Sequence, residues 1–276
     1  MICFPSCKIN LGLRITQKRA DGFHALETVF FPISIKDALE IIIEPDTNAA
    51  PITFTSSGLA INGDPSDNLC FKAYGLLKKD YPTIPNIKMH LHKTIPMGAG
   101  LGGGSSDGAF TLVALNQLFN LQLSEQALLN YALQLGSDCP FFIINTPAFA
   151  TGRGEILKPI NLNLDGYSIV IVNPGIAIST KLAFSLITPK IPDNNLAAVI
   201  QQPISTWKDV LINDFEQPIF NSFPELANIK ETLYQKGAVY ASMTGTGSTV
   251  FGIFPTSMMD TLSFNFPSHY FIATAS

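Results

Sequence analysis

The glycine-rich segment at residues 98–104, followed at once by two serines, is the feature that most constrains this chain. Glycine lacks a Cβ atom, so such a run can turn tightly and bring several backbone N–H groups close to one ligand. The apolar stretch 109–115 predicts a helix over about 105–119, with Ser105 and Ser106 in its first turn. Unpaired N–H groups and the positive end of the helix dipole then favour an anion. The segment therefore predicts a polyphosphate site, and hence a bound nucleotide.

The two most familiar phosphate-loop patterns do not fit this segment. A P-loop pattern that begins at Gly98 requires lysine at position 104, where this chain has glycine. The spacing GxGxxG is present from Gly98 to Gly103, but a dinucleotide-binding unit needs a strand after its helix. Here Ser124 predicts the cap of a second helix that runs to about residue 135. A glycine-rich turn without a ligand is the alternative, although no packing gain would offset the chain entropy that so many glycines lose.

The composition describes a chain that can build a large core and carries little charge. Hydrophobic residues make up 46% and charged residues 14%, and the net charge is −4 with a pI of about 5.5. This balance disfavours a broad nucleic-acid surface, which needs clustered Lys and Arg. The four cysteines lack the paired spacing of zinc sites and are expected to be reduced thiols. The stretch before Lys8 is too short for a signal peptide and lacks its basic start, and no stretch approaches the roughly 18 apolar residues of a membrane span. We therefore expect a cytoplasmic protein with no membrane partner.

Strands and helices are mixed along the chain, which predicts an α+β fold. Residues 1–157 are expected to form one lobe and residues 158–276 a second, with a last strand that can complete the second lobe or return to the first. Hydrophobic patterning predicts the following elements. Strands are expected at 9–16, 26–34, 38–44, 52–56, 86–94, 167–173, 239–242, 249–254 and 270–274, a buried run at 141–144, and helices at 68–81, 105–119, 124–135 and, two or three in number, between 180 and 236.

Three segments together resemble the sequence motifs of the GHMP kinases. They are PSCKINLGL at 5–13, PMGAGLGGGSSDGA at 96–109 and SMTGTGSTVF at 242–251, and they stand in the family's order across nearly the whole chain. The resemblance implies an ATP-dependent small-molecule kinase that uses Mg²⁺. It also implies a two-lobed fold, with an ATP-binding N-terminal lobe (residues 1–157) similar to the second domain of ribosomal protein S5 and a ferredoxin-like C-terminal lobe (residues 158–276) on the substrate side. A small-molecule substrate is therefore expected, with no nucleic-acid partner, in a monomer or weak homodimer.

Two further segments, RADGFH at 19–24 and LGSDCP at 135–140, resemble one branch of that family. Its members phosphorylate the 2-hydroxyl of an alcohol joined to cytidine diphosphate, in the non-mevalonate route to isoprenoids. One alternative is a family member for another alcohol, such as homoserine or mevalonate. The other is a nucleotide-binding or RNA-binding module without turnover, against which the acidic pI weighs.

Asp138 is the candidate catalytic residue. It stands between Gly136 and Pro140, where a carboxylate can accept a proton from an attacking hydroxyl, although a turn or cap aspartate has the same appearance. The resemblance places Lys8 beside this aspartate, where an ammonium would favour a developing alkoxide. Whether Asp138 removes the proton fully or mainly orients the hydroxyl is left open.

The remaining expected contacts rest largely on the resemblance. Near a polyphosphate, Asp107 would have to face Mg²⁺ or solvent; we favour instead a first-turn helix aspartate whose charge suits the dipole. His90 and His92 are expected on a solvated strand face and not at a metal. No metal ligand is assigned. Candidate ATP-binding residues are Asn68, Lys93, Pro96, Gly98, Gly100, Gly102, Gly103, Gly104, Ser105 and Ser106, and candidate substrate-binding residues are Asn10, Phe23, His24, Thr180, Phe184, Gly245 and Gly247. Family members often have tyrosine where this chain has Phe23, which keeps ring stacking but removes a hydroxyl.

Overall fold

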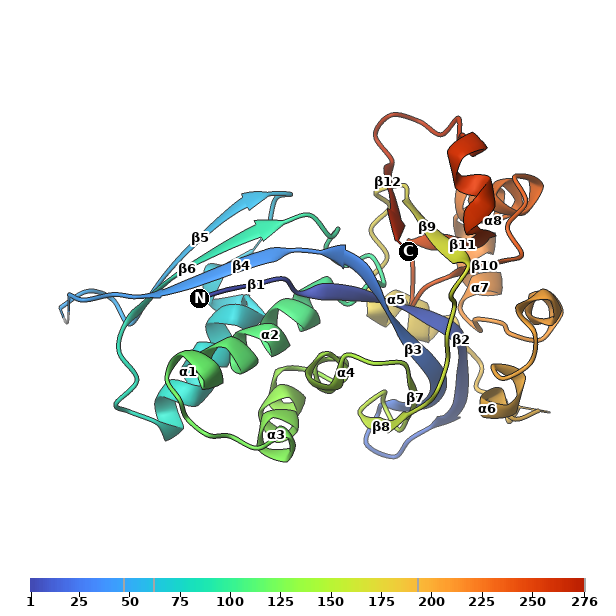
Figure 1. Cartoon of the computed structure of the whole chain (residues 1–276). Helices are drawn as coiled ribbons and strands as arrows, with labels where there is room; N and C mark the ends of the chain where they lie inside the picture. Colours follow the sequence, from blue (N-terminus) through green and yellow to red (C-terminus); the bar gives the residue numbers. More distant parts are fainter. Residues whose placement is uncertain (47, 62, 193, 276) are drawn as a thin grey trace. The chain divides into compact units, whose positions relative to one another are not determined.

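The computed structural model describes residues 1–46, 48–61, 63–192 and 194–275 of the chain. These residues form two compact units, each assembled from three chain segments (Figure 1). The first unit comprises Met1–Cys7, Ile35–Met97 and Gly102–Asn145, and the second comprises Lys8–Ser34, Gly98–Leu101 and Thr146–Ser276. The units therefore interleave along the sequence and do not follow a single boundary at residue 157. The binding roles predicted for the lobes 1–157 and 158–276 stay predictions.

A four-stranded sheet with helices on one face makes up the first unit (Figure 1). Its strand order is β1 (Ile2–Cys3), β4 (Ala38–Ile43), β6 (Ile87–Lys93) and β5 (Ile52–Gly58), with only the β5–β6 pair parallel. Strand β6 alternates strictly, since Ile87, Met89 and Leu91 are buried while Lys88 and His92 are exposed. The helices are α1 (Leu69–Asp80), α2 (Gly103–Leu118), α3 (Glu125–Leu135) and α4 (Cys139–Ile144).

Helix starts in the first unit largely follow the predicted caps. The Asn68 side chain accepts a hydrogen bond from the Cys70 N–H at 2.9 Å, and the Ser124 hydroxyl accepts one from the Ala127 N–H at 3.3 Å. Helix α2 begins at Gly103, two residues earlier than predicted. The apolar run 141–144, whose state the sequence left open, is helical and belongs to α4.

Two sheets make up the second unit. The first has the order β2 (Ser6–Lys18), β3 (His24–Lys36), β7 (Ala148–Thr151) and β8 (Ile156–Pro159). Strands β7 and β8 are absent from the sequence-based prediction. Residues 152–155, close to the expected boundary between lobes, are the turn of the β7–β8 hairpin, with Gly152 and Gly154 at positive φ.

The second sheet is antiparallel throughout, in the order β10 (Tyr240–Met243), β11 (Val250–Pro255), β9 (Tyr167–Asn173) and β12 (Phe271–Ala275). Because β12 pairs with β9, the last strand completes this sheet. Among the described residues between 180 and 236 there are four α-helices where two or three were predicted. They are α5 (Thr180–Ser185), α6 (Leu196–Val199), α7 (Glu216–Ser222) and α8 (Pro224–Gln235), and short 3₁₀ turns lie at Pro65–Asp67, Ile204–Asp209 and Thr256–Thr261.

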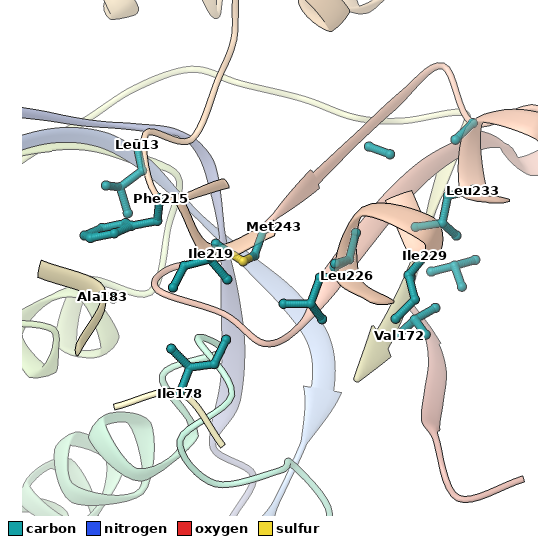
Figure 2. Packing of buried hydrophobic residues seen from close by; sticks show 14 of the residues in the cluster. Leu13, Val172, Ile178, Ala183, Phe215, Ile219, Leu226, Ile229, Leu233 and Met243 are labelled. Atoms are coloured by element: carbon teal, nitrogen blue, oxygen red, sulfur yellow. The ribbon is translucent and has the colours of Figure 1, made fainter. Parts of the chain in front are cut away.

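The core of the second unit forms where α8 packs on β10 and β11. Leu226, Ile229 and Leu233 recur at helical spacing and are buried, and Val172 and Met243 meet them from the sheet (Figure 2). Each such side chain stabilises the fold by about 1.5–3 kcal/mol through burial. This core supports the end of β10, from which the C-terminal glycine motif emerges.

None of the helices among the described residues is long and apolar enough to cross a membrane. None of the four cysteines, all of which the structure describes, is in a disulfide; three of them are buried and Cys3 is half-buried.

Candidate active site

Lys8 is a buried cation at the glycine loop of the second unit. Its side chain lies on β2, and the residue is only 3% exposed. The Nζ atom donates to the Asn10 Oδ1 at 2.6 Å and to the carbonyl oxygen of Gly100 at 2.9 Å, and it stands 5.2 Å from the centre of the Phe30 ring. Lys8 is therefore not a solvated lysine at the start of a strand, since its charge fixes a carbonyl of the glycine loop.

Asn10 joins the N-terminal motif to the C-terminal glycine motif. Its Oδ1 atom accepts from the Thr244 hydroxyl at 3.1 Å and from the Gly245 N–H at 2.9 Å, and its own N–H donates to the Thr244 hydroxyl at 3.0 Å. Its Nδ2 donates to the Thr28 hydroxyl at 2.9 Å. Segments from all three sequence motifs thus meet around one buried amide. The predicted hydrogen bond from Asn10 to substrate stays a prediction, and its Oδ1 is already occupied by protein donors.

Two glycines in this cluster are needed because backbones approach closely. A Cβ atom on Gly100 would lie 2.1 Å from the Thr244 carbonyl oxygen, and one on Gly245 would lie 3.0 Å from the Gly100 Cα. Both residues also have positive φ, +78° and +57°. The predicted contacts of these glycines with ligands stay predictions, since packing of one loop on the other already explains why glycine stands at both positions.

The aromatic residues expected at the substrate lie in the second unit as well. The His24 ring stacks on the Phe184 ring with centroids 4.9 Å apart, and Phe184 in turn meets Phe215 edge-on at 5.0 Å. Phe23 is 52% exposed, and the Arg153 guanidinium stands 4.8 Å from its ring centre. A half-exposed ring backed by a cation is a surface on which a planar base can stack.

The helix that follows the glycine loop begins without a side-chain cap in the first unit. Gly102 occupies the cap position in the left-handed conformation at φ +71° and has no side chain to offer. The first N–H groups of the helix, from Gly103 onward, have no partners within α2 and are positioned for an anion. Among the residues that the structure describes, the buried Ser106 hydroxyl also lacks a hydrogen-bond partner.

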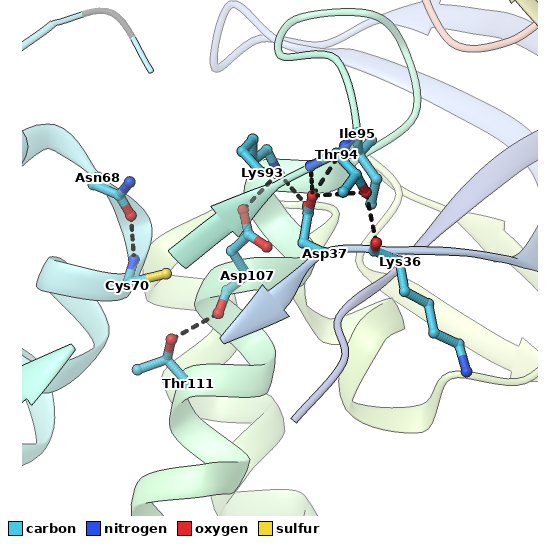
Figure 3. Close-up of polar contacts among 9 residues, drawn as sticks. All are labelled: Lys36, Asp37, Asn68, Cys70, Lys93, Thr94, Ile95, Asp107 and Thr111. Atoms are coloured by element: carbon cyan, nitrogen blue, oxygen red, sulfur yellow. Dashed lines mark hydrogen bonds and ion pairs between the residues drawn. The ribbon is translucent and has the colours of Figure 1, made fainter. Parts of the chain in front are cut away.

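Lys93 is buried in a cluster of three charges in the first unit (Figure 3). Its ammonium pairs with Asp37 and, at 2.7 Å, with Asp107. Asp37 also accepts hydrogen bonds from the N–H groups of Thr94 at 2.6 Å and Ile95 at 2.9 Å. The structure thus differs from our expectation for Lys93, which was to reach phosphate or purine: its charge is taken up by two carboxylates beneath α2.

Burial and charge act against each other in this cluster. Burial by itself would lower the pKa of Lys93, but the carboxylates of Asp107 and Asp37 raise it above its ordinary value. Burial raises the pKa of Asp107 to about 7, against the opposing effect of Lys93. Asp107 is therefore not the first-turn aspartate that we favoured: α2 begins at Gly103, so Asp107 lies beyond its first turn, and its carboxylate is buried against the Lys93 ammonium.

Gly103 allows Lys93 to occupy this place. A Cβ atom on Gly103 would lie 3.0 Å from the Lys93 Nζ and 2.9 Å from the Ile95 Cγ2. By contrast, the nearest atom to a Cβ on Gly104 would be the Met97 Cε at 3.5 Å, an ordinary contact. Gly103 is therefore required by packing, whereas nothing in the first unit demands glycine at 104.

Asp138 precedes α4, with Pro140 in the first turn of that helix. Its side chain forms no capping hydrogen bond to α4. The alternative interpretation as a turn or cap aspartate fits its position, in the turn at the N-cap of α4, and a catalytic role stays a prediction. Lys8 belongs to the other unit, and the expected pairing of Lys8 with Asp138 stays a prediction too.

The other candidate residues occupy ordinary places. Asn68 caps α1, and Ser105 lies in the first turn of α2. Pro96 is half-buried, and Gly98 is exposed at φ +63°. Thr180 is exposed at the start of α5, and Gly247 lies in the turn between β10 and β11 at φ +90°. His90 and His92 share a face of β6 and hydrogen-bond the hydroxyls of β5, with Ser57 reaching both rings. No group of three or more metal-ligating side chains occurs among the described residues.

Sequence reasoning missed the polar residues that support these loops. Asp37, Asn213 and Glu216 are buried and hold backbone groups of the two glycine segments or their flanks. The sequence holds a signal for Asn213 alone. It stands with Asp214 directly after the apolar residues Leu211 and Ile212, and a polar side chain in such a stretch can be a buried supporting residue.

Comparison with known proteins matches this arrangement to one family. The model of the GHMP kinases' N-terminal domain matches residues 68–152, and that of their C-terminal domain matches residues 198–259. The chain belongs to the GHMP kinase family, whose phosphoryl donor is ATP. A solved mevalonate kinase from Methanococcus jannaschii shares the fold, with a TM-score of 0.70 at 14% identity over 100% of this chain and 97% of that chain.

Relatives with higher identity carry a more specific name. A 4-diphosphocytidyl-2-C-methyl-D-erythritol kinase from Bacteroides fragilis is 51% identical over 254 residues, which is 92% of either chain. One of the same name from Cytophaga hutchinsonii is 48% identical over 257 residues, 93% of either chain. A crystal structure of a 4-(cytidine 5'-diphospho)-2C-methyl-D-erythritol kinase superimposes with a TM-score of 0.80 at 30% identity, over 100% of this chain and 99% of that chain. These findings confirm the expected family and its α+β fold.

Proposed function

We propose that this chain transfers the γ-phosphoryl group of ATP to the 2-hydroxyl of 4-diphosphocytidyl-2-C-methyl-D-erythritol, a step of the non-mevalonate route to isoprenoids. The observation that carries the proposal is the identity of about half of all residues with kinases of that name, over more than nine tenths of both chains. The RADGFH segment folds into a turn in which the Arg19 N–H donates to the Phe23 carbonyl oxygen at 2.8 Å, and the Phe23 ring is 52% exposed.

ATP is proposed to bind along the glycine loop and the start of α2. The uncapped N–H groups that follow Gly102 suit the phosphates, and the residues proposed to contribute are the candidate set from Asn68 to Ser106 named above. Lys93 would not contact ATP directly. It would support the start of α2 through its ion pair with Asp107.

The protein's part in the transfer is proposed to be positioning and proton acceptance. The acceptor's hydroxyl oxygen forms a bond to the γ-phosphorus while the bond from that phosphorus to the β–γ bridging oxygen breaks and ADP leaves. Asp138 accepts the hydroxyl proton, and the Lys8 ammonium favours the negative charge that develops on the oxygen. The Asn10 amide holds Lys8 in place at 2.6 Å.

The acceptor's cytosine is proposed to lie by Phe23, His24 and Phe184, with Thr180 and the C-terminal glycine motif near the rest of the molecule. Phe184 and His24 are already in ring contact at 4.9 Å. The exposed face of Phe23 offers stacking without a phenolic hydroxyl.

Mg²⁺ is proposed to accompany ATP. The donor set fits an ion held mainly by phosphate oxygens and water, because Mg²⁺ keeps several waters and needs few protein ligands. The buried Ser106 hydroxyl, which has no partner among the described residues, is the group best suited to such an ion or its water. When bound, Mg²⁺ would neutralise charge on the phosphates. We further propose that the protein works in the cytoplasm, as a monomer or weak homodimer, without a nucleic-acid or membrane partner.

The proposal is tested by ADP release from ATP with each of three alcohols: 4-diphosphocytidyl-2-C-methyl-D-erythritol, homoserine and mevalonate. We expect turnover with the first alone, and a preference for either of the others would refute the assignment. Asp138→Asn should keep ATP affinity within about threefold and lose at least about 1,000-fold in kcat, because only the transition state needs the proton acceptor. A protein that merely binds nucleotides would show no transfer before or after the substitution.

A further inference from the structure

The turn at residues 244–248, which we call the C-terminal glycine turn, is held by buried side chains where it leaves β10. The Asn213 Nδ2 donates to the carbonyl oxygens of Met243 at 2.8 Å and Gly245 at 2.9 Å. The Glu216 Oε1 accepts from the Met243 N–H at 2.7 Å. Because Asn213 and Glu216 are both buried, the peptide groups on this side of the turn cannot rotate without losing partners that water would not replace.

The two glycine N–H groups of the turn are already used inside the protein. The Gly245 N–H donates to the Asn10 Oδ1 at 2.9 Å, and the Gly247 N–H donates to the Thr244 carbonyl oxygen at 3.0 Å. Gly245 and Gly247 were expected to let the backbone approach the substrate phosphates or the first glycine loop. The close approach of Gly245 to Gly100 fits the second of these, the N–H groups of both glycines shape the turn, and their contact with substrate stays a prediction.

The returning side of the turn is held in the same way. The Ser248 hydroxyl donates to the Ile176 carbonyl oxygen at 2.6 Å and accepts from the Asn173 Nδ2 at 3.2 Å. That Nδ2 also donates to the Thr249 hydroxyl at 3.0 Å. Buried polar side chains therefore grip the turn at both ends.

Thr246 is left at the tip. It is half-buried, whereas the other residues of the turn are buried. In the part of the chain that the structure describes, neither the N–H nor the hydroxyl of Thr246 has a hydrogen-bond partner. One residue thus offers two donors on a support that is already rigid, which is the arrangement that binds a developing or fixed anion most strongly.

The surroundings of the turn are suited to a phosphoryl group. The glycine loop packs directly on it, since a Cβ atom on Gly100 would lie 2.1 Å from the Thr244 carbonyl oxygen. The Lys8 ammonium donates to the Gly100 carbonyl oxygen at 2.9 Å and brings a positive charge to the same loop. A positive charge therefore lies on the loop that packs against this turn, which favours an anion there.

We propose that the Thr246 N–H and hydroxyl bind a phosphoryl oxygen in the kinase reaction, an inference that rests on the proposed function. The oxygen belongs either to ATP or to the diphosphate of the acceptor, because both present the same chemistry. In either case Thr246 is the ligand-contacting residue of the C-terminal glycine turn, and the glycines on each side shape it.

The test replaces the hydroxyl while keeping the shape. Thr246→Val removes it, Thr246→Ser retains it, and Thr83→Val makes the same chemical change at an exposed threonine elsewhere. Affinities are measured by calorimetry with ADP and with CDP as probes, and KM is measured for ATP and for the acceptor. Loss of one hydrogen bond to a charged oxygen should weaken one probe by about 10- to 100-fold in Thr246→Val and by less than about threefold in the other two variants.

The pattern identifies the source of the oxygen. Weakened ADP binding with a raised KM for ATP assigns it to the nucleotide, and weakened CDP binding with a raised acceptor KM assigns it to the acceptor. A second variant carries the α-hydroxy acid analogue of threonine at 246, which removes only the N–H, and should weaken the same probe. If both 246 variants bind ADP and CDP within about twofold of the wild type, or if Thr246→Ser weakens binding as much as Thr246→Val, the inference fails.

The inference and the proposed function fail separately. Absence of turnover by the wild type with the acceptor would refute the proposed function, while a loss of ADP or CDP affinity in Thr246→Val would still support the phosphoryl contact. Normal turnover with unchanged kinetic constants and affinities in both 246 variants would refute the contact alone.

Discussion

Removing the ammonium of Lys93 should destabilise the protein more than the loss of any surface ion pair. Lys93→Met keeps most of the buried stem but leaves Asp37 and Asp107 without a counter-ion, and all three charged side chains are at most 3% exposed. Asp37 still has the N–H groups of Thr94 and Ile95, whereas Asp107 loses its Lys93 partner and its Oδ1 already has none. Breaking a buried pair in this way costs about 3–5 kcal/mol. At about 2–4 °C per kcal/mol, the unfolding midpoint should fall by roughly 6–20 °C.

The size of this loss should depend on pH, with a definite sign. Burial raises the pKa of Asp107 to about 7, above the ordinary carboxyl value of about 3.9. The folded state therefore binds the proton more tightly than the unfolded state, and stability contributed by this group is lost as pH rises from about 4 to about 7. Without Lys93 the charged form of Asp107 is less favourable still. The penalty of Lys93→Met should be smallest near pH 5 and largest near pH 8.

The measurement is thermal unfolding followed by circular dichroism at pH 5 and pH 8. Trp207 is the sole tryptophan and is buried in the second unit, so its fluorescence reports separately on that unit. Lys72→Met is the matched control, because Lys72 pairs with Asp67 at the surface and such pairs contribute about 0–1 kcal/mol. Adding Asp107→Asn to Lys93→Met should restore part of the lost stability. A Lys93→Met midpoint equal to that of Lys72→Met, or a loss that neither pH nor Asp107→Asn alters, would refute the reasoning.

Three further changes have definite expected outcomes. Gly103→Ala should lower the midpoint of thermal unfolding, because its methyl group would lie 2.9–3.0 Å from neighbouring side chains. Gly104→Ala should keep or raise the midpoint, because the nearest atom to its methyl group would be 3.5 Å away. Thermal unfolding of the two variants side by side tests this. Gly75→Ala should stabilise α1 by about 1 kcal/mol, because nothing lies within 4 Å of the new methyl group, and urea unfolding that shows a loss would contradict this. Asn213→Ala removes the Nδ2 donor from two buried carbonyl oxygens, those of Met243 and Gly245, and should cost about 1–3 kcal/mol in the same assay. No loss would mean that the turn does not depend on this amide.

Much of the fold could be predicted because local patterns agree with the final structure. Strand β6 alternates, α1 and α3 have side-chain caps at Asn68 and Ser124, and β9 ends at a Pro-Gly pair, so each is legible from neighbours in sequence. Strands β7 and β8 were missed because they are only four residues long and their Gly-containing turn resembles a linker. The pairing that makes them strands comes from β3, more than a hundred residues away.

The candidate site also has a part that the sequence could predict and a part that it could not. The glycine loop, Lys8 and Asn10 are recognisable as motifs, and the structure places Lys8 and Asn10 in one network with Gly100 and Gly245. The inward turn of Lys93 could not be anticipated, because its partner Asp37 lies 56 residues earlier at the end of a strand whose pattern gives no sign of an ion pair. Hydrogen bonds between distant segments are set by packing, which local sequence does not encode.

The interleaving of the two units bears on how the chain is made on the ribosome. Residues 8–34 leave the ribosome early, but β7, which pairs with β3, lies more than a hundred residues further along the chain. Leu13 and Ile15 of β2 wait longer still, because the core that they join includes Ile219 of α7 and Leu226 of α8. A fragment that stops at residue 157 should consequently leave this part of β2 without its core and open to proteases, even where the sheet of residues 38–93 and its helices have formed.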